Sequence, residues 1–131
     1  MMLSENEFLI IEDHNIDLQI AKIKIQQKYP KVNFVKACNG QEAIELIQHR
    51  IDYGINLPGI ILLDLYMPIL NGYEFLDVFI KIFPKYLTKP KIVILTSSVN
   101  PLDKKLSVNY NIIDGFLIKP LDLNQLQDLI D

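Results

Sequence analysis

The stretch IILLDLYMPILNGYEFL, residues 60–76, carries the clearest fold signal in the chain. Its four apolar residues at 60–63 predict a short buried strand that ends at Asp64. Pro68 and the pair Asn71-Gly72 predict a loop, after which a helix is expected to run to about residue 83, where Pro84 stops it. A buried strand, a polar strand end, a loop and a helix therefore follow one another in this segment.

The same unit recurs on both sides of this segment. Short apolar runs predict further strands at residues 8–11, 32–37, 91–95 and 115–118. Helical patterns follow at residues 16–28, 40–50, 101–110 and 123–130. Pro101 suits the first turn of its helix, and Asp122 can cap the last one. In the first helix the residues at near-helical spacing are Ile16, Ile20, Ile23 and Ile25, and the inner side of the second is expected to carry Ala43, Ile44 and Ile47.

The order of the elements predicts an α/β fold. Strands made of continuous β-branched residues and leucines are buried on both faces, as in a parallel sheet covered by helices. Strict alternation of strand and helix implies right-handed crossovers between neighbouring parallel strands. We therefore expect five parallel strands and five helices.

Length and composition narrow the class of protein. The chain has 131 residues, half of them apolar, which suits one globular domain. The formal net charge is -3 and the basic residues are scattered, so we expect no direct nucleic-acid surface. Cys38 is the single cysteine, which excludes an internal disulfide. No apolar run reaches the roughly 20 residues that span a bilayer, and the first residues lack a secretory pattern, so we expect a cytoplasmic protein with no membrane segment.

Polar residues gather where the apolar strands end. Glu12 and Asp13 follow the first strand and Asp64 follows the third, while Thr96 and Lys119 follow the fourth and fifth. Open parallel sheets bind ligands at the carboxyl ends of their strands, where the strand order reverses. We therefore expect three carboxylates, one hydroxyl and one ammonium group to share a small pocket.

Each of these residues has an ordinary structural interpretation on its own. An aspartate after a strand is often a cap or turn residue, a Thr-Ser-Ser run such as 96–98 is often a turn, and a single lysine is usually a solvated charge. Phe116 and Met67 alone would be core residues. The functional hypothesis rests on the coincidence of four strand ends.

The charges in such a pocket require a cation. Two like charges 4 Å apart repel by roughly 4 kcal/mol at an effective dielectric constant near 20. Three carboxylates beside one lysine must therefore bind a metal ion or take up protons. Oxygen ligands with room for water suit Mg²⁺, and a carboxylate beside Mg²⁺ can attack phosphorus to give an aspartyl-phosphate.

With these residues in place, the chain resembles the receiver domain of two-component response regulators over essentially its whole length, 1–131. The segments that carry the resemblance are FLIIEDHNIDL, NGQEAIELI, IILLDLYMPILNGYEFL, KIVILTSS and DGFLIKPL. Their order and spacing are far more specific than any one of them. The resemblance implies a flavodoxin-like (βα)5 fold with strand order 2-1-3-4-5.

By this resemblance Asp64 is the phosphoacceptor. Asp13 would bind Mg²⁺ directly, Glu12 mostly through water, and the backbone carbonyl of Tyr66 would be a further ligand. Thr96 would hydrogen-bond the phosphoryl group and Lys119 would form an ion pair with it.

The resemblance also implies a conformational switch and protein partners. Phe116 stands where the family carries a rotating aromatic residue, and the peptide bond before Pro120 is expected to be cis. The donor would be a histidine kinase or a histidine phosphotransfer protein. The output would be a downstream protein bound by the face at residues 100–131, and the chain would be a monomer or weak dimer. It would be no enzyme beyond catalysing its own phosphorylation and dephosphorylation.

Three positions depart from the usual family pattern. The acidic pair is Glu12-Asp13 where Asp-Asp is usual. This pair should still bind the metal ion, but the Glu12 side chain reaches farther from the backbone than an Asp side chain would. Tyr66 is bulky at a position that lines the path of the attacking water, so it bears on the lifetime of the phosphoryl group. Phe116 lacks the hydroxyl of a tyrosine switch and can act only through packing.

Four readings of the chain compete. We favour a stand-alone receiver with no output domain, since the chain ends with the last helix and residues 121–131 contain no Lys or Arg for dimer salt bridges. The alternative is a receiver excised from a longer transcription factor or hybrid kinase. A phosphohydrolase with an Asp nucleophile typically has a second Asp where Tyr66 stands. A flavodoxin-like cofactor binder, or a receiver that has lost phosphorylation, is disfavoured by the intact Asp64, Thr96 and Lys119.

Overall fold

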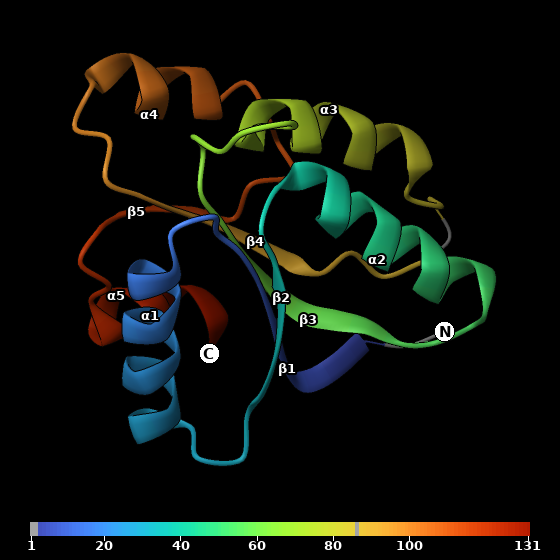
Figure 1. Ribbon diagram of the computed structural model, residues 1–131, viewed down its shortest axis with the longest axis horizontal. Coiled ribbons are helices and arrows are strands. Elements are labelled where there is room, and N and C mark those ends of the chain that lie inside the picture. The colour runs from blue at the N-terminus through green and yellow to red at the C-terminus, as the bar shows by residue number, and fades with distance from the viewer. Residues whose placement is uncertain (1–2, 86) are drawn as a thin grey trace.

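The computed structural model describes residues 3–85 and 87–131, and the predicted receiver range 1–131 includes Met1, Met2 and Tyr86, which lie outside the described residues. Strands and helices alternate along the chain (Figure 1). The strands are β1 (Leu3–Ile11), β2 (Asn33–Ala37), β3 (Leu57–Leu63), β4 (Lys91–Thr96) and β5 (Gly115–Ile118). The helices are α1 (Asn15–Lys28), α2 (Gly40–Asp52), α3 (Gly72–Ile82), α4 (Pro101–Ser107) and α5 (Leu123–Ile130).

The five strands form one parallel sheet in the order β2-β1-β3-β4-β5. This order confirms the predicted flavodoxin-like fold. Strand order reverses beside β1, so the carboxyl ends of β1 and β3 lie next to each other: Ile11 pairs with Leu63. Glu12 and Asp64, the residues that follow this pair, are thereby placed side by side.

Alternate residues of the central strands enter two separate cores. Leu9, Ile61 and Ile94 belong to the core under α2 and α3, whereas Ile10 and Leu62 belong to the core under α1 and α5. In Figure 1 these two pairs of helices lie on opposite sides of the sheet. Every residue of β3 is buried, as expected for the central strand of a sheet covered on both faces. The phosphoacceptor candidate therefore follows the most enclosed strand of the sheet.

Side-chain caps fix where several helices begin. Asn71 accepts a hydrogen bond from the backbone N–H of Glu74, and the Glu74 side chain accepts one from the N–H of Asn71, which completes a capping box at the start of α3. Asp122 accepts from two backbone N–H groups at the start of α5, as predicted. Pro101 occupies the first turn of α4, and the Lys119-Pro120 peptide bond is cis, also as predicted.

Several predicted boundaries were wrong, and the near-helical spacing of isoleucines in α1 does not mark its buried face. Both β1 and β3 begin earlier than expected, because Leu3 pairs with Leu57 and Ser4 with Pro58, although Pro58-Gly59 resembles a loop in the sequence. Conversely, α4 ends at Ser107, and a turn follows at residues 108–109. Three of the four isoleucines of α1 are exposed (Ile16, Ile20 and Ile23), and the buried stripe is Leu18, Ala21 and Ile25. All other predicted elements are present within a few residues of their expected ends.

Candidate functional site

The acidic residues meet at the carboxyl ends of β1 and β3. Carboxylate oxygens of Glu12, Asp13 and Asp64 all lie within 4.8 Å of one another. Glu12 and Asp64 are only 5% and 7% exposed, whereas Asp13 is exposed to solvent. Buried carboxylates this close repel one another strongly. The group therefore has the oxygen donors, the excess negative charge and the open side that a divalent cation such as Mg²⁺ requires.

Burial and, to a lesser extent, the nearby Asp64 carboxylate raise the pKa of Glu12 to about 7, against the opposing effect of the hydrogen bond from Lys119. The charged form of Glu12 is therefore disfavoured, first by burial and then by the neighbouring carboxylate. A divalent cation at these carboxylates would favour the charged form.

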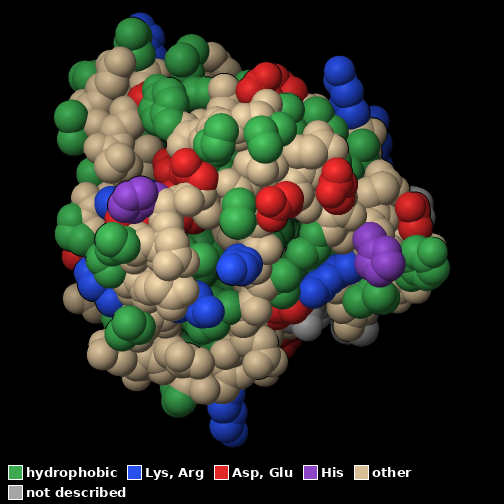
Figure 2. All heavy atoms as spheres, viewed as in Figure 1, with side chains coloured by type: hydrophobic (Ala, Val, Ile, Leu, Met, Phe, Trp, Pro, Cys, Tyr) green, Lys and Arg blue, Asp and Glu red, His purple; other side chains and the backbone are tan. Residues whose placement is uncertain are grey.

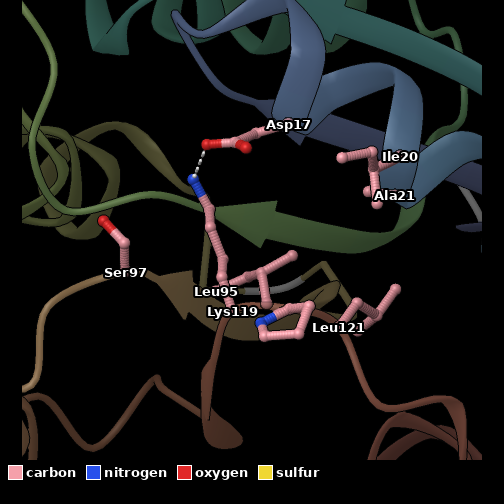
Figure 3. Close-up of a pocket in the computed structure, with 8 residues that line it drawn as sticks. Asp17, Ile20, Ala21, Leu95, Ser97, Lys119 and Leu121 are labelled. Atoms are coloured by element: carbon pink, nitrogen blue, oxygen red, sulfur yellow. Dashed lines mark hydrogen bonds and ion pairs between the residues drawn. The ribbon is translucent and has the colours of Figure 1, made fainter.

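Lys119 reaches the acidic residues from the end of β5. Its ammonium group is hydrogen-bonded to Glu12 and lies 3.4 Å from Asp64 Oδ2. It also donates to Asp17 Oδ2, 2.9 Å away in the first turn of α1 (Figure 3). Burial alone would lower the pKa of this lysine, but the hydrogen bonds to Glu12 and Asp17 outweigh it and raise the pKa. Lys119 is therefore a fixed positive charge beside Asp64.

Gly72 lets the loop after β3 fold closely over the site. A β-carbon at this position would lie 2.5 Å from the carbonyl oxygen of Asp64 and 2.8 Å from the Leu65 Cα. Real side chains do not tolerate such contacts with backbone atoms. The backbone N–H of Gly72 donates to the carbonyl of Leu65, 2.9 Å away, so α3 begins directly against the strand end that carries Asp64.

Thr96 and Phe116 lie on the neighbouring strands. Thr96 ends β4, is fully buried and accepts a hydrogen bond from the backbone N–H of Ser98, 3.2 Å away. Phe116 pairs with Ile94 in the register of β4 and β5 and is half-buried. It also lines a hollow of about 240 Å³ together with Ser98 and α4 residues. Thr96 thus lies at the sheet edge that carries the acidic residues, and Phe116 lies beside α4.

Sequence reasoning missed two acidic residues at or near the site. Asp17 lies in the first turn of α1 and shares Lys119 with the predicted site. It also borders a hollow of about 280 Å³ between α1 and the loop after β5 (Figure 3). Asp103 is buried in α4 and binds the hydroxyl groups of Tyr66, Tyr73 and Ser98. Its position one turn into a helix gave no signal, because an acidic residue there usually faces solvent.

The sequence matches the response regulator receiver domain family over residues 8–131. The chain belongs to that family. The fold and strand order described above are those that membership leads one to expect, and a role in two-component signalling follows from it.

Individual relatives are similar across most of their length. A two-component response regulator from Cytophaga hutchinsonii is 28% identical, with a TM-score of 0.84, and the match covers 94% of this receiver and 92% of that chain. The bacteriophytochrome response regulator AtBRR is 26% identical, with a TM-score of 0.79 and 95% and 89% coverage. A probable methanogenesis regulatory protein, FilR2, from Methanothrix harundinacea is 27% identical over 94% of the receiver and 77% of its own length.

No helix among the described residues of the receiver is long and apolar enough to cross a membrane. On the face shown in Figure 2, Lys and Arg side chains are interspersed with acidic ones, and no broad basic patch is visible.

Proposed function

We propose that this receiver accepts a phosphoryl group on Asp64 from a histidine kinase or a histidine phosphotransfer protein. The observation that carries the proposal is the position of the Asp64 carboxylate, 7% exposed, between two further acids and the ammonium group of Lys119. A carboxylate held beside a fixed cation and within a group of acids that can bind a metal ion suits nucleophilic attack on a phosphoryl group.

In the proposed reaction, an oxygen of Asp64 forms a bond to phosphorus as the bond from phosphorus to the donor atom breaks. The donor atom keeps the electron pair, and the product is an acyl phosphate on Asp64. Lys119 balances part of the charge on the transferred oxygens, and Thr96 donates its hydroxyl to one of them. The receiver catalyses only this modification of itself and its reversal, so it is no enzyme in the sense of turning over a separate substrate.

Mg²⁺ fits the acidic group. Asp13, Asp64 and Glu12 would hold it, and by family resemblance the Tyr66 backbone carbonyl would complete the protein ligands. When bound, it would neutralise charge on the carboxylates and on the incoming phosphoryl group. The three carboxylates within 4.8 Å of one another support this assignment, because negative charges this close repel unless a cation binds between them.

A downstream protein would bind the face formed by α4, β5 and α5 and distinguish the phosphorylated receiver there. Movement of Thr96 toward the phosphoryl group would vacate space that Phe116 can enter, because packed interiors do not tolerate voids. Apolar side chains are exposed on and beside α4 (Val99, Leu102, Leu106 and Val108). No Lys or Arg occurs in residues 121–131, so the face suits a protein partner better than DNA.

The test is labelling with a reactive small donor. Incubation with acetyl phosphate and Mg²⁺ should add one phosphoryl group to the wild-type chain, measured by intact-mass spectrometry. Asp64→Asn keeps the size of the side chain but removes the nucleophile, so it should not be labelled. Equal labelling of this variant, or none of the wild type, would contradict the proposal.

A further inference from the structure

Asp103 is a buried carboxylate held by hydroxyl groups. It lies in α4, is 3% exposed, and forms no ion pair with any residue in the described part of the chain. Oδ1 accepts hydrogen bonds from the hydroxyls of Tyr66, at 2.6 Å, and Tyr73, at 2.7 Å. Oδ2 accepts one from the Ser98 hydroxyl. A buried charge without a cation destabilises the fold unless hydrogen bonds stabilise it. The charge of Asp103 therefore depends on these three hydroxyl groups.

The three hydroxyls come from three different segments. Tyr66 lies two residues after Asp64, in the loop after β3, and Ser98 lies two residues after Thr96, in the loop after β4. Tyr73 belongs to α3, on the core side. Asp103 therefore joins the two loops beside the phosphorylation site to α4.

The directions of the pKa shifts of Asp103 and Tyr66 agree with these hydrogen bonds. Burial would raise the pKa of Asp103, but the hydrogen bonds from Ser98, Tyr66 and Tyr73 outweigh it and lower the pKa. The hydrogen bond to Asp103 is the largest of the causes that raise the pKa of the Tyr66 hydroxyl. Asp103 is thus charged and Tyr66 is a neutral donor to it throughout the physiological range.

The bond from Tyr66 to Asp103 fixes the direction of the tyrosine ring. The ring leaves the backbone beside the end of β3, and its hydroxyl ends at α4, the helix that follows β4. Tyr66 thus links the loop that begins at Asp64 to α4, and Ser98, which binds the same carboxylate, also donates its backbone N–H to Thr96. The Tyr66 side chain is 55% exposed, so one part of it faces solvent while the rest covers protein.

We propose that Asp103 is a positioning residue that holds the Tyr66 ring across the solvent side of the phosphorylation site and so protects the phosphoryl group from water. This inference rests on the proposed function. In the reaction that it slows, a water oxygen bonds to phosphorus and the bond from phosphorus to the Asp64 oxygen breaks. Asp64 recovers the electron pair as a carboxylate, and the proton of the water leaves with inorganic phosphate or passes to solvent.

The experiment compares the decay of phosphorylated wild type with that of four single variants. Each protein is labelled with acetyl phosphate and Mg²⁺ and freed of donor, and the loss of the phosphoryl group is followed by intact-mass spectrometry. Tyr66→Phe keeps the ring but removes its tether, and Asp103→Ala removes the acceptor. Asp103→Asn keeps an oxygen that can accept from Tyr66, so it should recover part of the effect. Tyr73→Phe is the matched control, because it removes a hydroxyl bond to the same oxygen from a residue outside the loops beside the site.

A hydrogen bond to a charged group is strong enough for its loss to change the fraction of tethered ring by about tenfold. We therefore expect Tyr66→Phe and Asp103→Ala to shorten the phosphoryl lifetime by a factor of about three to ten, Asp103→Asn to fall between them and wild type, and Tyr73→Phe to match wild type.

Four outcomes separate this inference from the function on which it rests. Lifetimes that follow the expected order support it. An unchanged or longer lifetime in Tyr66→Phe overturns the protective role while leaving phosphorylation intact. Equal shortening in Tyr66→Phe and Tyr73→Phe also overturns it, since that pattern means general loosening of α4. A wild type that never takes up a phosphoryl group overturns the proposed function and this role with it.

Discussion

Glu12→Gln should make the metal-free receiver more stable at alkaline pH, although it removes a hydrogen-bonded charge. Burial and the nearby Asp64 raise the pKa of Glu12 from 4.5 to about 7 in the folded state. A carboxyl group with a raised folded-state pKa contributes stability below its unfolded pKa, and that stability is lost as pH rises through the folded pKa. The loss therefore occurs between about pH 4.5 and pH 7.

A shift of this size corresponds to roughly 3 kcal/mol of unfolding free energy across that window. Glutamine is neutral at every pH and has nearly the shape of protonated glutamate. At pH 5 the variant should therefore be about as stable as wild type, and by pH 8 it should be more stable by an amount approaching this value.

Urea denaturation in the presence of a chelator, at pH values from 5 to 8, measures the difference directly. Glu45→Gln is the matched control, because Glu45 is an exposed carboxylate on α2, and its pH profile should run parallel to that of wild type. Parallel profiles for wild type and Glu12→Gln would refute the reasoning, because they would mean that Glu12 is not electrostatically strained in the folded chain.

The remaining predictions concern the metal, the loop after β3 and the switch. Mg²⁺ at ten times its Kd should raise the unfolding free energy by about 1.4 kcal/mol, and Asp13→Ala should lose most of that gain in a thermal melt; an equal gain in both would exclude Asp13 as a ligand. Gly72→Ala should cost about 1–3 kcal/mol in urea denaturation because its β-carbon would meet the Asp64 carbonyl at 2.5 Å, and an unchanged midpoint would contradict this. Beryllofluoride, which mimics the phosphoryl group, should shift the backbone amide NMR signals of Thr96, Phe116 and α4. Shifts confined to the loops around Asp13 and Asp64 would contradict the switch.

The fold and the centre of the site could be predicted because they depend on local order repeated along the chain. A buried parallel strand needs a continuous apolar run, and its carboxyl end must lie at the ligand-binding edge. Glu12, Asp13, Asp64 and Lys119 each follow such a run, so their convergence followed from topology alone.

Contacts that depend on side-chain direction could not be predicted. Ile16, Ile20 and Ile23 recur at near-helical spacing like a buried face, but α1 turns Leu18 and Ala21 inward instead. Two adjacent apolar stripes on one helix look alike in sequence, and only packing against the sheet selects between them.

Asp17 and Asp103 were missed for a related reason. Each lies in the first turn of a helix, where an acidic residue is favoured by the helix dipole and needs no further explanation. Their partners, Lys119 and Tyr66, are far away along the chain, and only the folded arrangement brings them together. The structure brings the predicted strand-end residues together, but that set lacks Asp17 and Asp103, the carboxylates that bind Lys119 and Tyr66.

The most direct test of the account is to locate the phosphoryl group within the chain. Borohydride reduces an aspartyl acyl phosphate to homoserine, which survives digestion and is identified by tandem mass spectrometry of the peptides. After treatment with acetyl phosphate and Mg²⁺, the account predicts homoserine at position 64 and at no other aspartate, with none formed when a chelator replaces the metal. Homoserine at Asp13 or Asp17, or its absence from position 64 in a labelled chain, would contradict the assignment of Asp64 as the phosphoacceptor.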